Sequence, residues 1–121
     1  MLDCLFVGFG GFIGSILRYL ICRIPLKHAG TFPFSTLIIN VAGAFALGFL
    51  AAYISKSVSL NPRYALFWKV GICGGFTTFS TFSLEALTLF QNGKAWTGLS
   101  YILLSVTLGI CAAVFGMSLC K

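Results

Sequence analysis

Apolar residues fill four long stretches of this chain, and the segments between the stretches are short and polar. The stretches run from Leu2 to Ile24, Phe34 to Ser55, Tyr64 to Phe90 and Ala95 to Leu119. Each reaches the ~20 residues that a helix needs to cross a bilayer. The links carry turn-forming pairs such as Asn61-Pro62 and Asn92-Gly93. Strand-like alternation of polar and apolar residues is absent, so the pattern predicts four transmembrane helices.

Composition supports a membrane protein and narrows its class. The chain has 121 residues, 59% of them hydrophobic and 8% charged, with a mean hydropathy of +1.02. A soluble domain is about 25% charged. The first stretch follows Asp3 rather than a basic segment, so we expect no removable signal peptide. Residues 1–121 are therefore expected to form a single all-α transmembrane domain.

The sequence offers no enzyme chemistry. The five cysteines are scattered and lie mostly in apolar context, where small buried hydrophobic residues are expected rather than metal ligands or redox pairs. No pairing of a nucleophile with a base and no metal cluster stands out. We therefore expect a protein that is not an enzyme.

Lysine and arginine are divided evenly between the two ends of the predicted helices. With four spans both termini lie on one side, and the charges there are Lys56, Arg63, Lys69 and Lys121. The charges on the other side are Arg18, Arg23, Lys27 and Lys94. A Lys/Arg excess normally sets orientation, so a balance of 4 against 4 favours insertion in both directions. One dominant loop setting a single orientation is the alternative. The basic side chains behind the net charge of +6 are then expected to lie at both membrane faces, and they do not indicate nucleic acid binding.

Size and small residues point to close packing and to a second copy. Four helices of this length cannot easily surround an aqueous path and also face lipid, so transport would need a homodimer. Small residues recur at helix spacing, which lets helix backbones approach closely in a membrane. The pairs are Gly10 and Gly14, Ala44 and Gly48, Gly71 and Gly75, and Ala112 and Gly116.

The third stretch contains the unusual segment GICGGFTTFSTFSLEA, residues 71–86. Residues 64–90 would make a helix of about 40 Å at 1.5 Å per residue, against a hydrocarbon core of ~30 Å. Gly74-Gly75 is a weak point, and the side chains of Thr77 and Thr78 can bond backbone groups in place of helical partners. The segment predicts a helix broken near the midplane, where transport proteins place ions. A kink relieved by neighbouring helices is the alternative.

Three blocks resemble the signatures of the CrcB/Fluc fluoride channels. They are GFGGFIGSILRY at 8–19, TLIINVAGAFALG at 36–48 and GICGGFTTFSTFSLE at 71–85, in the family's order and over the whole chain. Ser15 stands where the family commonly has alanine. The resemblance implies a fluoride-selective channel that exports toxic cytoplasmic fluoride by passive conduction. It also implies an antiparallel, dual-topology homodimer with two pores, as a multi-pass protein of the inner (plasma) membrane.

The resemblance assigns roles to residues of this chain. The backbone carbonyls of Gly74 and Thr77 would hold a structural Na⁺ on the two-fold axis of the homodimer. Phe79 and Phe82 would be pore rings and Asn40 a pore-lining amide. The remaining residues form a polar track or stand at its ends: Ser80, Thr81, Tyr101 and Ser105 in the track, and Arg18 in a structural role near a vestibule.

Several of these residues have other readings on chemistry alone. Phe79 and Phe82 are three apart and share a helix face, and the positive edge of a ring can meet an anion without a full charge; lipid-facing bulk is the alternative. Asn40 could bond another helix or donate to an anion. Glu85 could be a protonated or hydrogen-bonded part of the track, or a rim residue. The competing function is a small dual-topology multidrug/cation exporter, which needs a membrane-embedded carboxylate; the first span offers only Asp3, at its end.

Overall fold

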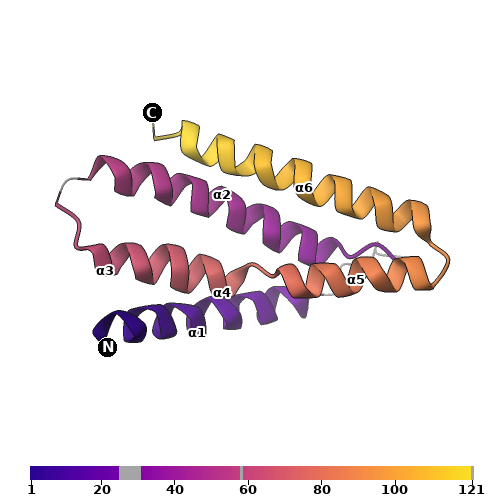
Figure 1. The fold of residues 1–121 in the computed structure, drawn as a ribbon, viewed down its shortest axis with the longest axis horizontal. Helices are drawn as coiled ribbons and strands as arrows, with labels where there is room; N and C mark the ends of the chain where they lie inside the picture. Colours follow the sequence, from indigo (N-terminus) through magenta and orange to yellow (C-terminus); the bar gives the residue numbers. More distant parts are fainter. Residues whose placement is uncertain (25–30, 58, 121) are drawn as a thin grey trace.

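The computed structural model describes residues 1–24, 31–57 and 59–120, and helices account for nearly all of these residues (Figure 1). The first two helices are α1 (Leu2–Cys22) and α2 (Phe34–Lys56). The third span consists of α3 (Pro62–Ala65), the π-helix η1 (Leu66–Cys73), α4 (Gly74–Phe76) and α5 (Phe79–Gln91), and α6 (Ala95–Ser118) follows. No strand occurs among the described residues.

The four predicted spans are confirmed as helical, with ends that differ from the predicted ones by one or two residues. α1, α2 and α6 are each long and apolar enough to cross a membrane. The third span is divided into a helical piece at 62–76 and α5 at 79–91. Because the two pieces are of similar length, the break falls near the middle of the span, as predicted.

The helices run alternately in opposite directions, so both termini lie at the same end of the molecule (Figure 1). α1 packs along η1 and α4, whereas α2 packs along α6, and α5 also contacts α6. Lys56 and Arg63 lie at the end with the termini, and Arg23 and Lys94 lie at the opposite end. Lys27 and Lys121, which the charge comparison also used, are outside the described residues.

The glycines of the predicted small-residue pairs pack inside the subunit. A Cβ atom added to Gly71 would lie 2.8 Å from the Cα of Gly10, so η1 and α1 touch backbone to backbone. A Cβ atom on Gly48 would lie 2.2 Å from the carbonyl oxygen of Ala113, which brings α2 equally close to α6. In lipid the hydrophobic effect does not favour contact between helices, so close packing at small residues of this kind stabilises their association.

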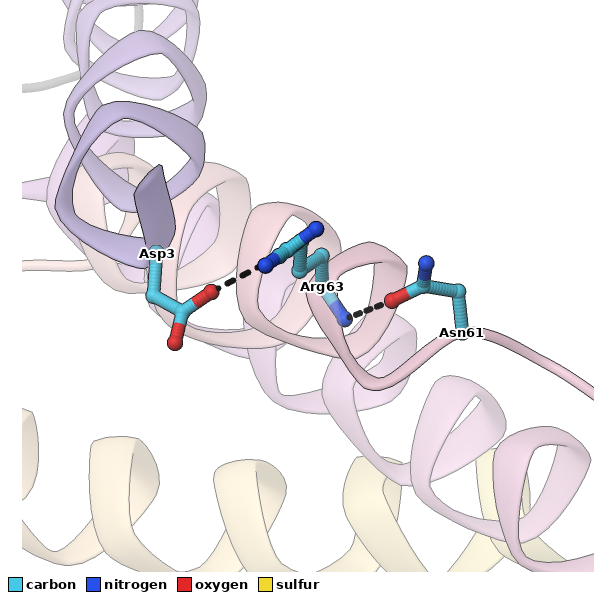
Figure 2. Close-up of polar contacts among 3 residues, drawn as sticks. All are labelled: Asp3, Asn61 and Arg63. Carbon is cyan, nitrogen blue, oxygen red and sulfur yellow. Dashed lines mark hydrogen bonds and ion pairs between the residues drawn. The ribbon is translucent and has the colours of Figure 1, made fainter. Parts of the chain in front are cut away.

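Side chains and backbone fix two of the helix ends. Asn61 accepts a hydrogen bond from the Arg63 N–H at 3.0 Å, with Pro62 as the first helical residue, and this arrangement starts α3. The Arg63 Nε atom also lies 3.0 Å from Asp3 Oδ1, which ties the start of α1 to the start of the third span (Figure 2). This ion pair is exposed, so it contributes at most about 1 kcal/mol.

The turn between α5 and α6 is a Schellman motif. Gly93 has a φ of +72°, a left-handed conformation that glycine adopts without a Cβ penalty. The Lys94 N–H donates to the Leu89 carbonyl at 2.9 Å, and the Gly93 N–H donates to the Phe90 carbonyl at 3.1 Å. The segment QNGK therefore ends α5 sharply and returns the chain into α6.

Candidate functional site

The break in the third span lies at Thr77 and Thr78, not at the glycines that precede them. Gly74 is helical, with φ −65° and ψ −39°, and α4 continues to Phe76. Thr77 and Thr78 are extended, with ψ values of 156° and 116°. The prediction that Gly74-Gly75 is the weak point is therefore wrong in position by about three residues. A Cβ atom on Gly75 would lie 2.6 Å from the Gly11 carbonyl oxygen, so this glycine serves packing against α1.

Asn40 on α2 holds the extended backbone at the break. The Thr78 N–H donates to Asn40 Oδ1 at 2.8 Å, and Asn40 Nδ2 donates to the Thr78 carbonyl at 3.1 Å. The side-chain amide thus pairs with Thr78 as a neighbouring strand would. Unpaired backbone groups are costly in a membrane interior, so this pairing makes the break tolerable. Of the two alternatives for Asn40, interhelical hydrogen bonding is confirmed.

Two backbone carbonyls at the break lose the N–H donors that they would have in an unbroken helix. The Thr78 N–H would donate to the Gly74 carbonyl, but it donates to Asn40. The Thr81 N–H would donate to the Thr77 carbonyl, but it donates to the Thr78 hydroxyl at 3.2 Å. The carbonyls of Gly74 and Thr77 are therefore deprived of their helical partners. Two main-chain oxygens become available at the middle of the span, and oxygen ligands of this kind suit a hard cation.

A new helix begins directly after the break. Thr78 is the N-cap of α5, with its hydroxyl accepting from the Thr81 N–H and contacting the Thr81 hydroxyl at 3.0 Å. The first turn of α5 carries Phe79, Ser80 and Thr81, and all three are exposed in the single subunit. A helix N-terminus carries partial positive charge. The break therefore places a positive helix end and hydroxyl groups at mid-span, on an open face.

The predicted pore rings stand in a row of aromatic side chains. Phe79 is 80% exposed, and its ring centroid lies 5.8 Å from that of Phe82. The Phe82 ring lies 5.1 Å from the ring of Tyr101 on α6, and Phe32 meets Tyr101 edge-on at 5.5 Å. The row leads from the break into the buried core between α2, α5 and α6, of which Tyr101 is the fully buried centre.

Glu85 lies at the far end of this row, inside the bundle. Tyr101 donates from its hydroxyl to Glu85 Oε2 at 2.8 Å, and Thr36 on α2 donates from its hydroxyl to Glu85 Oε1 at 2.8 Å. Both carboxylate oxygens are thus hydrogen-bonded to side chains of two other helices. Glu85 is therefore hydrogen-bonded, as one of its predicted readings requires, and its part in the polar track stays a prediction.

The side chains of two more predicted residues have no hydrogen-bond partner within the part of the chain that the structure describes. Ser105 lies on α6 one turn after Tyr101, and its Oγ atom is buried without a hydrogen bond among the described residues. Arg18 lies on α1 near the end opposite the termini and is half-buried. The structure therefore brings Asn40, Phe82, Tyr101 and Glu85 into one connected set, and it leaves Arg18 apart from that set.

A hollow of about 300 Å³ opens beside the break. The residues that line it are Asn40, Gly43, Ala44, Leu47, Thr77, Thr78 and Phe79. Gly43 makes room for the break, since a Cβ atom there would lie 2.2 Å from the Thr77 methyl carbon. The hollow therefore joins the amide, the extended backbone and the first aromatic ring.

Sequence reasoning missed two residues of this site. Thr36 was not selected, although it is buried and binds Glu85. Thr36 lies four residues before Asn40 and therefore on the same face of the helix, and this spacing could have identified it. Gly43 was overlooked in the block NVAGA, three residues after Asn40 and on that same face.

Comparisons with known proteins identify relatives over almost the whole chain. The family described as CrcB-like protein, Camphor Resistance (CrcB), matches residues 5–117. A protein of Rhizobium meliloti (strain 1021), named fluoride-specific ion channel FluC, is 44% identical over 118 residues, covering 97% of this chain and 94% of the relative. Proteins with the same name from Ruminiclostridium cellulolyticum and Clostridium perfringens (strain 13 / Type A) are 43% and 39% identical and cover all of this chain and 94% and 95% of their own lengths.

Proposed function

The chain belongs to the CrcB family, and we infer from this membership that it is a fluoride-specific ion channel. The observation that carries the inference is a sequence identity of 39 to 44% to relatives named fluoride-specific ion channel, over nearly their full length. The multi-pass helical fold agrees with this function. A channel transfers an ion and transforms no substrate, so the chain is not an enzyme. Passive conduction down a gradient would remove fluoride from a cell that has accumulated it.

The row of side chains along α5 and α6 supports a route for a small anion. The edges of aromatic rings carry partial positive charge, and Phe79 and Phe82 are adjacent at the positive end of α5. Asn40 uses one of its two amide hydrogens on Thr78, which leaves the other to donate to an anion in the hollow. The hydroxyls of Ser80 and Thr81, and beyond them that of Ser105, would replace water. Tyr101, whose hydroxyl donates to Glu85, would line the track with its ring. None of these groups carries a fixed positive charge, so a bound anion can leave again.

The exposed face of the break supports an antiparallel homodimer. Phe79, Ser80 and Thr81 are exposed at the middle of the third span, and polar groups there cannot remain against lipid. Glycines such as Gly48 and Gly71 pack inside the subunit, whereas Gly74 stands on the open face where a second copy could lie. A second copy would cover the break and supply the other wall of each pore. Each subunit of the dimer would be one four-span domain, residues 1–121. Arg18 would have a structural role near a vestibule.

The freed carbonyls support a structural Na⁺ between the two copies. In a two-fold dimer, Gly74 and Thr77 would each contribute their carbonyl oxygen twice, which makes four oxygen ligands. Their donors are diverted to Asn40 and to the Thr78 hydroxyl, so the oxygens need another partner. A bound cation would offset carbonyl dipoles that lipid cannot solvate. The ion would serve assembly rather than conduction.

Anion efflux from liposomes tests the function directly. Purified protein is reconstituted into vesicles loaded with fluoride or chloride, and the loss of each ion is followed with an ion-selective electrode. We expect rapid loss of fluoride and retention of chloride. Equal loss of both anions, or no loss of either, would refute the channel, and proton-coupled movement of an organic cation would support the exporter instead.

A further inference from the structure

A second hollow lies beside the α5–α6 turn. This turn is at the end of the molecule opposite both termini (Figure 1). It has a volume of about 250 Å³ and is lined by Thr31, Pro33, Leu84, Glu85, Thr88, Leu89 and Asn92. Glu85 joins this hollow to the interior, because its carboxylate is bound by Thr36 and Tyr101 of the aromatic row. The row of side chains that starts at the break therefore leads, through Glu85, to this hollow.

Lys94 is held at the rim of this opening by two contacts. Its backbone N–H donates to the carbonyl of Leu89 at 2.9 Å, as part of the turn that ends α5. Its Nζ atom donates to the hydroxyl of Thr31, 63 residues away along the chain. Leu89 and Thr31 both line the hollow. The ammonium group is thus placed at the rim by the fold and is not simply extended into solvent.

Among the described residues, two features of the opening are unfavourable for an anion. The C-terminus of α5 ends here, and a helix C-terminus carries partial negative charge. The acidic side chain of Glu85 also lines this hollow. A cation at the rim opposes both, and charged openings with low-dielectric walls concentrate ions of the opposite sign.

Resting on the fluoride channel function proposed above, we propose that Lys94, anchored by Thr31, is the anion-collecting residue at the mouth of the conduction path. It acts on the rate at which fluoride enters and not on the choice between fluoride and chloride, which depends on the narrower aromatic row. Its action is through space, so it weakens as salt screens the charge. The Debye length falls from roughly 30 Å at 0.01 M to roughly 3 Å at 1 M salt.

The test compares fluoride efflux of four proteins at low and high ionic strength, each reconstituted from the same oligomeric peak. They are wild type, Lys94→Gln, Lys94→Arg and Lys56→Gln. Lys56 is an exposed lysine at the opposite end of its own subunit. In an antiparallel dimer it would share a membrane face with Lys94 of the partner subunit, so its variant controls for the total charge of that face. We expect Lys94→Gln to slow efflux about threefold to tenfold at low salt, with recovery at high salt. Lys94→Arg and Lys56→Gln should match wild type at both.

A further variant tests the anchor. Thr31→Val removes the hydroxyl that holds the ammonium group and keeps the shape of the side chain. It should give part of the low-salt loss seen with Lys94→Gln, with fluoride still preferred over chloride. The proposal is overturned if Lys94→Gln matches wild type at low salt, if its loss is equal at both salt concentrations, or if Lys56→Gln loses as much. Failure of wild type to conduct fluoride would refute the channel function itself.

Discussion

At the scale of single residues, Asn40 is the side chain on which the break depends. It pairs with both the N–H and the carbonyl of Thr78, at 2.8 and 3.1 Å, and no other side chain in the described ranges makes two such bonds to the extended backbone. A single amide on α2 therefore decides whether the third span can leave helical geometry in mid-membrane.

Replacing Asn40 by leucine should remove both bonds at once. Each buried backbone group left without a partner costs about 1 to 3 kcal/mol, so we expect a clear fall in thermal stability and loss of fluoride efflux. Stability is measured by circular dichroism melting in detergent. Asn92→Leu, an exposed amide in the α5–α6 turn, is the control and should melt close to wild type. Equal stability of Asn40→Leu and wild type would show that the break needs no clamp.

Phe79 and Phe82 also act at the residue scale. Phe79→Ile and Phe82→Ile keep bulk and apolarity but remove the ring edge that would meet the anion. We expect roughly tenfold slower fluoride efflux, because about 1.4 kcal/mol of lost stabilisation slows a step tenfold. Phe12→Ile, an exposed ring on α1, should conduct as wild type does. Wild-type rates in both pore variants would mean that these rings only fill space.

At the scale of elements, the third span combines two different uses of glycine. Gly71 lets η1 lie against α1, with an added Cβ atom 2.8 Å from Gly10 Cα. Gly74, three residues later, has only the Lys69 carbonyl oxygen, at 4.0 Å, near the place of its Cβ atom. One glycine thus serves packing within the subunit, and the other stands on a face that is open in the subunit.

The same substitution at these two glycines should have different consequences. Gly71→Val should destabilise the subunit, by about 1 to 3 kcal/mol for overpacking, and lower the melting temperature of its helices. Gly74→Val should leave the subunit folded but disrupt the dimer, which gel filtration and cross-linking would detect, and Thr77→Ser should be mild because the ligand is a main-chain atom. If Gly74→Val forms a stable dimer that conducts normally, the proposed shared cation site is wrong.

At the scale of the whole molecule, charge is spread over both ends of the bundle. Lys56, Arg63 and Lys69 lie toward the end with the termini, where Arg63 pairs with Asp3 (Figure 2). Arg18, Arg23 and Lys94 lie at or near the other end. Neither end of the described chain has a strong excess of positive charge, so nothing in the fold itself favours one orientation over the other.

A topology reporter should therefore read on both sides of the membrane. We expect a C-terminal fusion to report mixed orientation in the unmodified chain, because a Lys/Arg excess is what normally selects one. Adding two or three lysines next to Ser59 should move the population toward one orientation, whereas adding glutamines there should not. A single orientation in the unmodified chain would contradict dual insertion and, with it, the antiparallel dimer.

The helical architecture and the place of the unusual span follow from the amino-acid sequence alone. Four apolar stretches of about 20 residues or more admit few other structures in a bilayer, where backbone groups must bond within their own segment. Their ends were therefore predictable to within one or two residues. Thr77 and Thr78 were visible as residues that compete for backbone hydrogen bonds, and Phe79 and Phe82 as neighbours on one face.

Only the tertiary structure decided which residues carry out the break and where the polar path continues. Gly74-Gly75 appeared to be the weak point because glycine lacks a side chain, but α1 packs against Gly75 and keeps that turn helical. The break lies at Thr78 because the side-chain amide of Asn40, 38 residues earlier, donates to the Thr78 carbonyl and accepts from the Thr78 N–H. Thr36 and Lys94 likewise acquire partners from distant helices and loops. Such contacts join segments far apart in the chain, so no local pattern could have specified them.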